Sequence, residues 1–252
     1  MKIFRVLKKI KNWPHVILCK IVGKNPTRVV LNDGMVISAP ANNTILAMIR
    51  EIFIDRVYTP YGLDIEKNDV VVDVGANIGL FALYAAAMTR NKVYAFEPFP
   101  ENVAYIAQNI ATNSINNIIY EQTAISDKIG IAKLYLGAIS GGHVLFDNTI
   151  TGQSRNYIEV PTRTLDQVMS MYVLERIDFL KMDCEGSEGH ILQAAMNGSL
   201  NKIRKIAMEF HDDISIISHD KIQQLLEDNG FDTWLQWDGL SGIGYVYAIH
   251  RE

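Results

Sequence analysis

The fold of this chain is decided by the stretch from residue 70 to residue 79, which reads Val70-Val71-Val72-Asp73-Val74-Gly75-Ala76-Asn77-Ile78-Gly79. Its apolar, β-branched start is typical of a strand buried on both faces, and a helical pattern follows the second glycine. Gly75 permits backbone angles that a Cβ atom would forbid and lets a ligand approach the main chain, while Gly79 lets the new helix pack close to the sheet. The stretch therefore predicts a strand that runs into a helix through a glycine turn.

A second apolar strand, Val93-Tyr94-Ala95-Phe96, ends in Glu97. In a parallel sheet this places a carboxylate beside the glycine turn, where it can accept hydrogen bonds from both hydroxyls of a ribose. The two features together predict a cofactor that contains adenosine.

The spacing of the glycines indicates which adenosine cofactor is bound. A dinucleotide site needs G-x-G-x-x-G, but here the spacing is G-x-x-x-G and Asn77 occupies the place of the second glycine, so the turn is not shaped for a diphosphate. Asp73 would repel phosphate and attract an ammonium group. S-adenosylmethionine has ribose and ammonium groups and no phosphate. The alternative is a buried strand and helix with an incidental Asp73 and two packing glycines.

The composition is that of one main globular domain. The chain has 252 residues, of which 48% are hydrophobic and 21% charged. We expect an N-terminal helix and hairpin lobe over residues 1–60 and a cofactor-binding domain over residues 61–252. The two cysteines, Cys19 and Cys184, support neither a disulfide framework nor a zinc site, and a cytoplasmic location is expected. The sequence contains no run of about 18 apolar residues, so no membrane-spanning helix is predicted. The lysines near the N-terminus argue against a signal peptide.

The net charge of −4 is unevenly distributed. Residues 1–28 contain eight basic and no acidic residues, so the rest carries 16 basic against 28 acidic residues, a net charge of −12. Nonspecific binding of nucleic acid by the body of the protein is therefore not expected. The basic segment is either an amphipathic helix that contacts an anionic membrane or a partner, or a solvated helix that covers an edge of the core; Trp13-Pro14 should interrupt it.

Along the chain, apolar runs alternate with helical patterns from residue 70 onward, which indicates a mostly parallel sheet with helices on both faces. Residues 28–38 predict a hairpin around Asn32-Asp33-Gly34, and residues 41–58 predict a helix. Residues 140–156 are polar enough for a mobile flap or an inert connection. The predicted strands are 70–74, 92–97, 117–121, 132–136, 157–160, 177–182, 203–210, 231–237 and 244–250, the last two as an antiparallel edge hairpin, and the predicted helices are 77–89, 101–113, 187–196 and 214–228.

Carboxylates cluster at the predicted strand ends, where ligands bind in open α/β sheets. Buried acids need a partner or a use, because burial of a charge is costly. Asp183 or Glu185 could instead cap the helix that follows them. The candidate site residues are Asp73, Glu97, the segment 121–124, the segment 183–186 and the segment 209–211.

Several motifs resemble those of the FkbM family of S-adenosylmethionine-dependent methyltransferases over roughly residues 60–215. This resemblance implies a class I methyltransferase fold, a Rossmann-like, seven-stranded, mostly parallel α/β sheet with an antiparallel edge strand. Cys184 and Ser187 depart from the pattern, which more often has an aliphatic and an aromatic residue there. The motifs are Val-Val-Asp-Val-Gly-Ala-Asn-Ile-Gly-Leu-Phe (71–81), Phe-Glu-Pro-Phe-Pro-Glu-Asn (96–102), Thr-Ala-Ile-Ser-Asp (123–127), Thr-Leu-Asp (164–166), Lys-Met-Asp-Cys-Glu-Gly-Ser-Glu (181–188) and Glu-Phe-His (209–211).

The resemblance also implies the roles of individual residues. Asp73, Gly75 and Gly79 would surround the methionine part of the cofactor, and Glu97 would bind the ribose. Phe99, Thr123 and Ala124 would border the adenine, and Asp183 would face the amine and the transferring methyl group. The complete predicted cofactor-binding set is Asp73, Gly75, Asn77, Gly79, Glu97, Pro98, Phe99, Thr123, Ala124 and Asp183.

The predicted reaction is transfer of the methyl group to a hydroxyl of a sugar, polysaccharide or secondary metabolite. Such a displacement needs alignment and removal of a proton. Asp183, Glu209 and His211 are the predicted catalytic residues, with His211 as the leading base because imidazole titrates near neutral pH. No metal is expected, although Asp183 and Glu209 could instead hold a divalent cation.

Two other functions stay open: a noncatalytic adenosine-binding domain, and an NAD(P)-dependent oxidoreductase, which the glycine spacing disfavours. Tyr58, Tyr61, Trp234 and Trp237 could stack on a sugar acceptor or fill the core. The sequence does not determine the acceptor or the oligomeric state.

Overall fold

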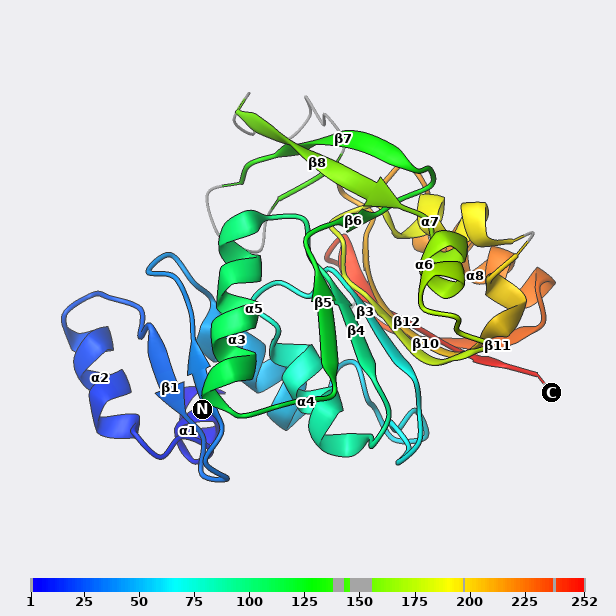
Figure 1. Cartoon of the computed structure of the whole chain (residues 1–252). Helices are drawn as coiled ribbons and strands as arrows, with labels where there is room; N and C mark the ends of the chain where they lie inside the picture. The colour runs from blue at the N-terminus through cyan, green and yellow to red at the C-terminus, as the bar shows by residue number, and fades with distance from the viewer. Residues whose placement is uncertain (1, 138–142, 146–155, 197, 238, 252) are drawn as a thin grey trace.

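The structure is a computed structural model of the chain and describes residues 2–137, 143–145, 156–196, 198–237 and 239–251. A central twisted sheet is covered by helices on both faces, and a small second sheet lies above one end of it (Figure 1). The seven-stranded, mostly parallel sheet that the resemblance implies is confirmed.

The central sheet has the strand order β11-β12-β10-β9-β3-β4-β5. The strands β5, β4, β3, β9 and β10 are parallel, and β12 is antiparallel to both β10 and β11. The last two strands thus form the expected antiparallel hairpin, with the reversed strand β12 on its inner side and β11 at the edge. The bounds are β3 Val71–Val74, β4 Val93–Phe96, β5 Ile118–Glu121, β9 Ile177–Met182, β10 Ile203–His211, β11 Phe231–Gln236 and β12 Ile243–His250.

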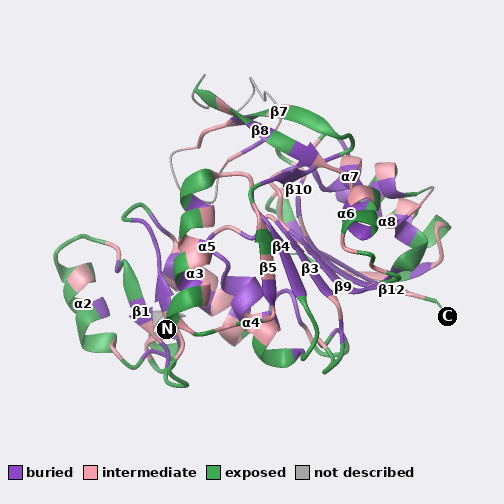
Figure 2. Ribbon diagram, in the orientation of Figure 1, coloured by how far each residue is buried: buried purple, intermediate pink, exposed green. Residues whose placement is uncertain are grey.

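Successive residues of the central strands face opposite hydrophobic cores, which is why these strands are apolar throughout. Val71 and Phe179 belong to the core under α4 and α5, whereas Val72 and Leu180 belong to the core under α6, α7 and α8. Figure 2 shows the inner strands of the sheet mostly buried, whereas the edge strand β5 is partly exposed. The helices are α4 Leu80–Met88, α5 Pro100–Thr112, α6 Leu165–Met171, α7 Glu188–Ala195 and α8 His219–Asp228, with a 3₁₀ turn η3 Leu200–Lys202 before β10.

The first sixty residues pack against the α4 and α5 side of the sheet. Val6, Ile10 and Val16 are buried and belong to the same core as Val71, so the apolar side of the basic segment is in part internal. The hairpin is tied to α5 by hydrogen bonds from Ser38 N to Asn109 Oδ1 and from Val36 N to Asn113 Oδ1, 2.8 Å each. The elements are α1 Lys2–Leu7, α2 Trp13–Ile21, β1 Arg28–Val30, β2 Val36–Ser38, α3 Ile45–Ile49 and the π-helical turn η1 Arg50–Asp55.

This packing does not test the predicted division at residue 60, nor the predicted contact of the basic segment with a membrane or partner. Within the described ranges, no helix is both long and apolar enough to cross a lipid bilayer.

Two predicted helices begin later in the structure than predicted, and one helix is additional. The helix predicted over 41–58 begins at Ile45 and changes to π-helical geometry at Arg50. The helix predicted over 214–228 begins at His219, where the Asp212 carboxylate accepts a hydrogen bond from the His219 main-chain N–H. Helix α6 was not predicted, although its N-cap, Thr164, accepts a hydrogen bond from the main-chain N–H of Gln167.

The middle segment forms a second sheet, of order β6-β8-β7. The two predicted strands are present as β7 Gly130–Tyr135 and β8 Tyr157–Arg163, which pair antiparallel, and β6 Ala124–Ile125 joins them. The flap predicted over residues 140–156 lies largely outside the described residues. Of that segment the structure describes residues 143–145 and 156, and Val144 pairs with Tyr135.

Candidate functional site at the carboxyl ends of the sheet

Two adjoining hollows open at the carboxyl ends of the parallel strands. The first, of about 560 Å³ counting space open to solvent, lies under the second sheet and is lined by Glu97, Pro98 and Ala124. The second, of about 710 Å³ on the same basis, lies beside the N-terminal elements and is lined by Tyr58, Glu209 and His211. The two hollows share a wall made of Gly75, Asn77, Asp183 and Glu185.

The glycine turn holds two parts of the protein against each other. Gly75 has φ +73°, and a Cβ atom there would lie 1.8 Å from the main-chain oxygen of Asp183. Gly79 has φ +85° at the N-cap of α4, and its Cβ would lie 3.3 Å from Ile106 of α5. A ligand was predicted to approach the main chain at Gly75, but in the structure the end of β9 lies there. Gly79 was predicted to pack close to the sheet, but in the structure it packs against α5.

Asp73 is fully buried and forms an ion pair with Lys181 on the neighbouring strand, with 3.1 Å between Oδ1 and Nζ. Beyond this ion pair, the described residues offer its oxygens no well-directed hydrogen bond. Burial raises the pKa of Asp73, and the Lys181 ammonium group opposes that shift. The sequence predicted that Asp73 attracts the ammonium group of a cofactor, but in the structure Lys181 supplies the ammonium group. Asp73 does not line either hollow.

Glu97 lies at the end of β4 with its carboxylate fixed by three donors. Oε2 accepts a hydrogen bond from Asn77 N at 2.8 Å, and Oε1 accepts from Phe99 N at 3.0 Å and from Asn102 Nδ2 at 3.2 Å. Burial raises the pKa of Glu97 to about 7, although these three donors lower it. The carboxylate is pre-oriented at the first hollow, and Oε2, which accepts one hydrogen bond, keeps a lone pair for a ligand.

The far end of the first hollow is apolar. Pro98, Ala124, Ile125 and Leu134 line it. Of the predicted adenine neighbours, Ala124 lines the hollow, whereas Thr123 is buried and donates a hydrogen bond to Pro161 O. Phe99 does not line the hollow but packs against the ring of His143, which does, with 4.2 Å between ring centroids.

Tyr58, from the N-terminal elements, joins the second hollow to the strand ends. Its hydroxyl lies 2.8 Å from Asp183 Oδ2 and 2.8 Å from Glu209 Oε2. Its ring packs edge-on against Phe81 and Tyr245. The sequence indicated Tyr58 only as an aromatic that could stack on a sugar. No spacing rule connects it to strand ends 125 and 151 residues away.

These contacts require a shared proton. A tyrosine hydroxyl has one hydrogen and can donate to only one of the two carboxyl groups, so the other must be protonated and donate to the tyrosine oxygen. Burial, then the nearby Asp183 charge, raises the pKa of Glu209 to about 8. Burial and the two carboxylates raise the pKa of Tyr58 well above its ordinary value, so its hydroxyl stays protonated. Glu209 is the group that holds the extra proton near neutral pH.

His211 lies at the end of β10 between two glutamates. Its Nδ1 is 3.5 Å from Glu188 Oε1, and its Nε2 is 3.6 Å from Glu185 Oε2. Burial lowers the pKa of His211, but Glu188, Glu185 and Asp183 together raise it to about 10. An imidazolium cannot accept a proton, so these surroundings do not suit His211 to the leading base role that the sequence predicted.

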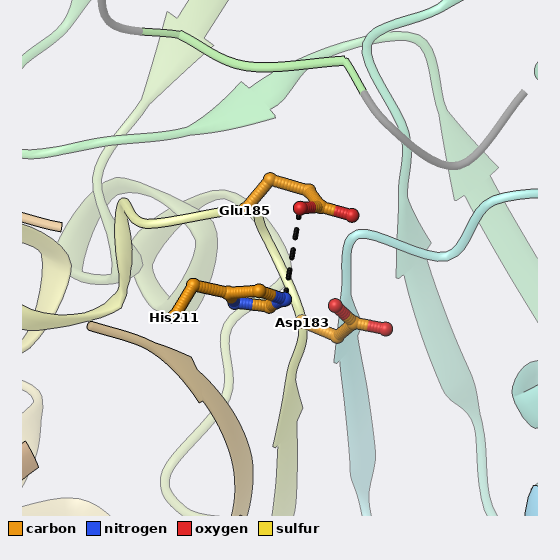
Figure 3. Close-up of side chains that lie close together, drawn as sticks. All are labelled: Asp183, Glu185 and His211. Carbon is orange, nitrogen blue, oxygen red and sulfur yellow. Dashed lines mark ion pairs between the residues drawn. The ribbon is translucent and has the colours of Figure 1, made fainter. Parts of the chain in front are cut away.

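Glu185 completes a cluster with Asp183 and His211 (Figure 3). One potential ligand atom from each of the three side chains lies within 4.8 Å of the other two, and this is the only such group among the residues that the structure describes. Glu185 has φ +52° in the turn after β9, and burial raises its pKa to about 7. The cluster differs from the predicted metal alternative, Asp183 with Glu209, because Glu209 points to Tyr58.

The structure therefore brings many of the predicted residues to one place. Asp73, Gly79, Phe99 and Thr123 do not line the hollows. The predicted residues that do are Gly75, Asn77, Glu97, Pro98, Ala124, Asp183, Glu209 and His211.

Comparison with known proteins finds similarity in sequence and in structure. The family model of the methyltransferase FkbM domain matches residues 73–233. The AMB antimetabolite synthetase AmbE of Pseudomonas aeruginosa is 31% identical over 228 residues, which span 76% of this chain and only 11% of that protein. The 31-O-demethyl-FK506 methyltransferase FkbM of Streptomyces tacrolimicus is 29% identical over 233 residues, 80% of this chain and 87% of that protein. A crystal structure of methyltransferase FkbM from Methylobacillus flagellatus KT aligns with a TM-score of 0.49 at 18% identity, over 77% of this chain and 48% of that chain.

Proposed function

The chain belongs to the FkbM methyltransferase family, and we propose that it transfers a methyl group from S-adenosylmethionine to a hydroxyl group of a sugar, polysaccharide or secondary metabolite. The name of the Streptomyces relative, 31-O-demethyl-FK506 methyltransferase, describes a methylation at oxygen, which supports a hydroxyl acceptor. The observation that carries the proposal is the shared wall: Asp183 faces a hollow suited to a nucleoside on one side and a hollow lined with carboxylates on the other.

The first hollow fits the cofactor. Glu97 presents a fixed carboxylate that would accept hydrogen bonds from the two ribose hydroxyls. The side-chain oxygen of Asn77 is buried without a hydrogen-bond partner among the described residues, and it would accept one from a ligand. Ala124, Ile125 and Leu134 offer an apolar surface to the adenine. The cofactor would supply a methyl group bound to a positively charged sulfur.

The second hollow would hold the acceptor and take its proton. The reacting hydroxyl needs a base as it attacks the methyl carbon. Asp183 and Glu209, linked through Tyr58, share two protons among the three groups and leave one carboxylate free, so a proton taken from the acceptor can enter the chain of hydrogen bonds. In the free protein, His211 is a cation that balances Glu185 and Glu188, and it does not serve as the base.

The first test is binding of the demethylated product, S-adenosylhomocysteine, by isothermal titration calorimetry. We expect saturable binding by the wild-type protein and a loss of roughly 10- to 100-fold in affinity for Glu97→Gln, since a hydrogen bond to a charged group contributes about 1.5–3 kcal/mol. Glu101→Gln is the matched control, because Glu101 is exposed in the first turn of α5. Equal affinity of the two variants would reject the assignment of the first hollow.

The second test is transfer of a labelled methyl group to a panel of glycans and hydroxylated metabolites. Transfer that depends on Asp183 and Glu209 supports the proposed reaction. Binding of S-adenosylhomocysteine without transfer to any member of the panel would instead favour a noncatalytic cofactor-binding domain.

A further inference from the structure

We propose that Asp183, Glu185 and His211 bind a divalent transition-metal cation at the wall between the two hollows. The three side chains come from the ends of the adjacent parallel strands β9 and β10 and from the turn after β9, and they point toward one another (Figure 3). The binding of the cation does not depend on the proposed function, but its role in the reaction does.

The spacing of the three donors suits one cation. Their ligand atoms lie within 4.8 Å of one another, with 3.6 Å between His211 Nε2 and Glu185 Oε2. Donors that each lie about 2.1 Å from one cation are roughly 3 to 4 Å apart, so small rotations of the side chains close the site. One imidazole and two carboxylates form a donor set suited to Mn²⁺ and related first-row ions.

A second observation concerns the ring of His211, which is 5% exposed. Its Nδ1 is buried, and its ion pair with Glu188 Oε1 is 3.5 Å long and lacks the geometry of a hydrogen bond. Its Nε2 lies 3.6 Å from the nearest carboxylate that pairs with it, beyond hydrogen-bonding distance. A cation on Nε2, with Glu188 accepting from Nδ1–H, would satisfy both nitrogens in the carboxylate–histidine–metal arrangement common in metalloproteins.

The charge around the cluster favours a cation. Glu51, Asp183 and Glu185 line the second hollow, against a single lysine, Lys181, whose ammonium group pairs with Asp73 at 3.1 Å and also lies 3.9 Å from Asp183 Oδ2. The carboxylates that favour a proton on His211 in the free protein would also favour a metal ion in its place. The ion would bind the hydroxyl oxygen of the methyl acceptor as a further ligand and lower the pKa of that hydroxyl. The second hollow would then be a site for an acceptor that reacts through a hydroxyl group.

A matched control exists within the chain. His219 is also buried and also lies beside two carboxylates, Asp212 and Asp220. No group of three donors within range of one another was found there among the described residues. His219→Asn therefore removes a buried, carboxylate-paired imidazole without touching the proposed metal site.

The test is titration of the metal-free protein with Mn²⁺. Binding is measured as the loss of the electron paramagnetic resonance signal of free Mn²⁺. We expect one saturable site in the wild type, at least about tenfold weaker binding in Glu185→Gln and in His211→Asn, and wild-type binding in His219→Asn. Absence of saturable binding, or equal binding by all four proteins, would overturn the proposal.

A measurement on the wild type alone guards against variants that fail to fold. Pulsed electron paramagnetic resonance of the Mn²⁺-bound protein should show hyperfine coupling to a directly bound imidazole nitrogen, and its absence would also overturn the proposal. Mn²⁺ binding without any binding of S-adenosylhomocysteine would reject the proposed function and keep the metal site. Cofactor binding and methyl transfer without Mn²⁺ binding would reject the metal site and keep the proposed function.

Discussion

Replacement of Gly75 by alanine tests the contact that defines the shared wall. The added Cβ would lie 1.8 Å from the main-chain oxygen of Asp183, whereas ordinary van der Waals contact begins near 3.4 Å. To restore ordinary contact, the turn would have to move away from the end of β9 by the difference, 1.6 Å. Such a shift would break the hydrogen bond from Asp183 N to Val74 O, which is 3.1 Å long.

The expected cost has three parts. An alanine held at positive φ costs about 1–2 kcal/mol. Steric overlap costs roughly another 1–3 kcal/mol, and a lost buried hydrogen bond about 1–3 kcal/mol. Gly62→Ala is the matched control, because Gly62 has φ +91° and nothing within 4 Å of its Cβ position, so it should show the first part alone.

Thermal and urea unfolding of the two variants measure the difference. At ~2–4 °C per kcal/mol for a chain of this size, Gly62→Ala should lower Tm by a few degrees and Gly75→Ala by several times as much. Gly75→Ala should also weaken binding of S-adenosylhomocysteine, because Asn77 in the same turn donates to Glu97. Equal destabilisation by the two variants would refute the close approach of the turn to β9.

Three further predictions follow from the charged groups. Lys181→Met should destabilise the fold by roughly 3–5 kcal/mol, because it leaves buried Asp73 without its partner; exposed Lys67→Met is the control. Lys181 lowers the pKa of Asp73, so its removal raises that pKa further and makes the loss larger at pH 8 than at pH 5; equal losses in urea unfolding at the two pH values would contradict this. The Tm of the wild type should fall between pH 6 and pH 9, because four groups have a higher pKa in the folded protein than in the unfolded chain. The folded pKa values are about 7 for Glu97 and Glu185 and about 8 for Glu209, against 4.5 for an unfolded glutamate, and about 10 for His211, against 6.5 for an unfolded histidine. Stability from each group is full below its unfolded pKa and is lost as the pH rises through its folded pKa; a Tm that rises over this range would contradict the environments described. Tyr58→Phe should shift the pH dependence of methyl transfer, since it removes the hydroxyl that joins Asp183 to Glu209. Fully exposed Tyr61→Phe should leave the profile unchanged, and a profile unmoved by Tyr58→Phe would exclude the shared proton.

The antiparallel pairing of β7 with β8 was not deducible from the segments alone. Both strands were predicted, but the residues that contact between them, such as Ala132 and Val160, are separated by a long connection. Strand pairing at that distance depends on what the rest of the fold brings together, because nothing local fixes the register.

The sequence by itself determined the central sheet and the edge where the site lies. Runs such as residues 70–72 are apolar on both faces, so only a sheet covered on both sides can bury them, and the carboxyl ends of its parallel strands meet at one edge. Glu97, Asp183, Glu209 and His211 could therefore be assigned to that edge from their positions after strands.

The tertiary structure alone decided which of these groups meet and what charge each carries. Lys181 neutralises Asp73, Tyr58 joins Asp183 to Glu209, and the glutamates around His211 keep it protonated. These properties depend on burial and on distances of a few ångströms between residues far apart in the chain. Local sequence patterns specify a strand and its end, but they do not specify the neighbours that set a side chain's electrostatic environment.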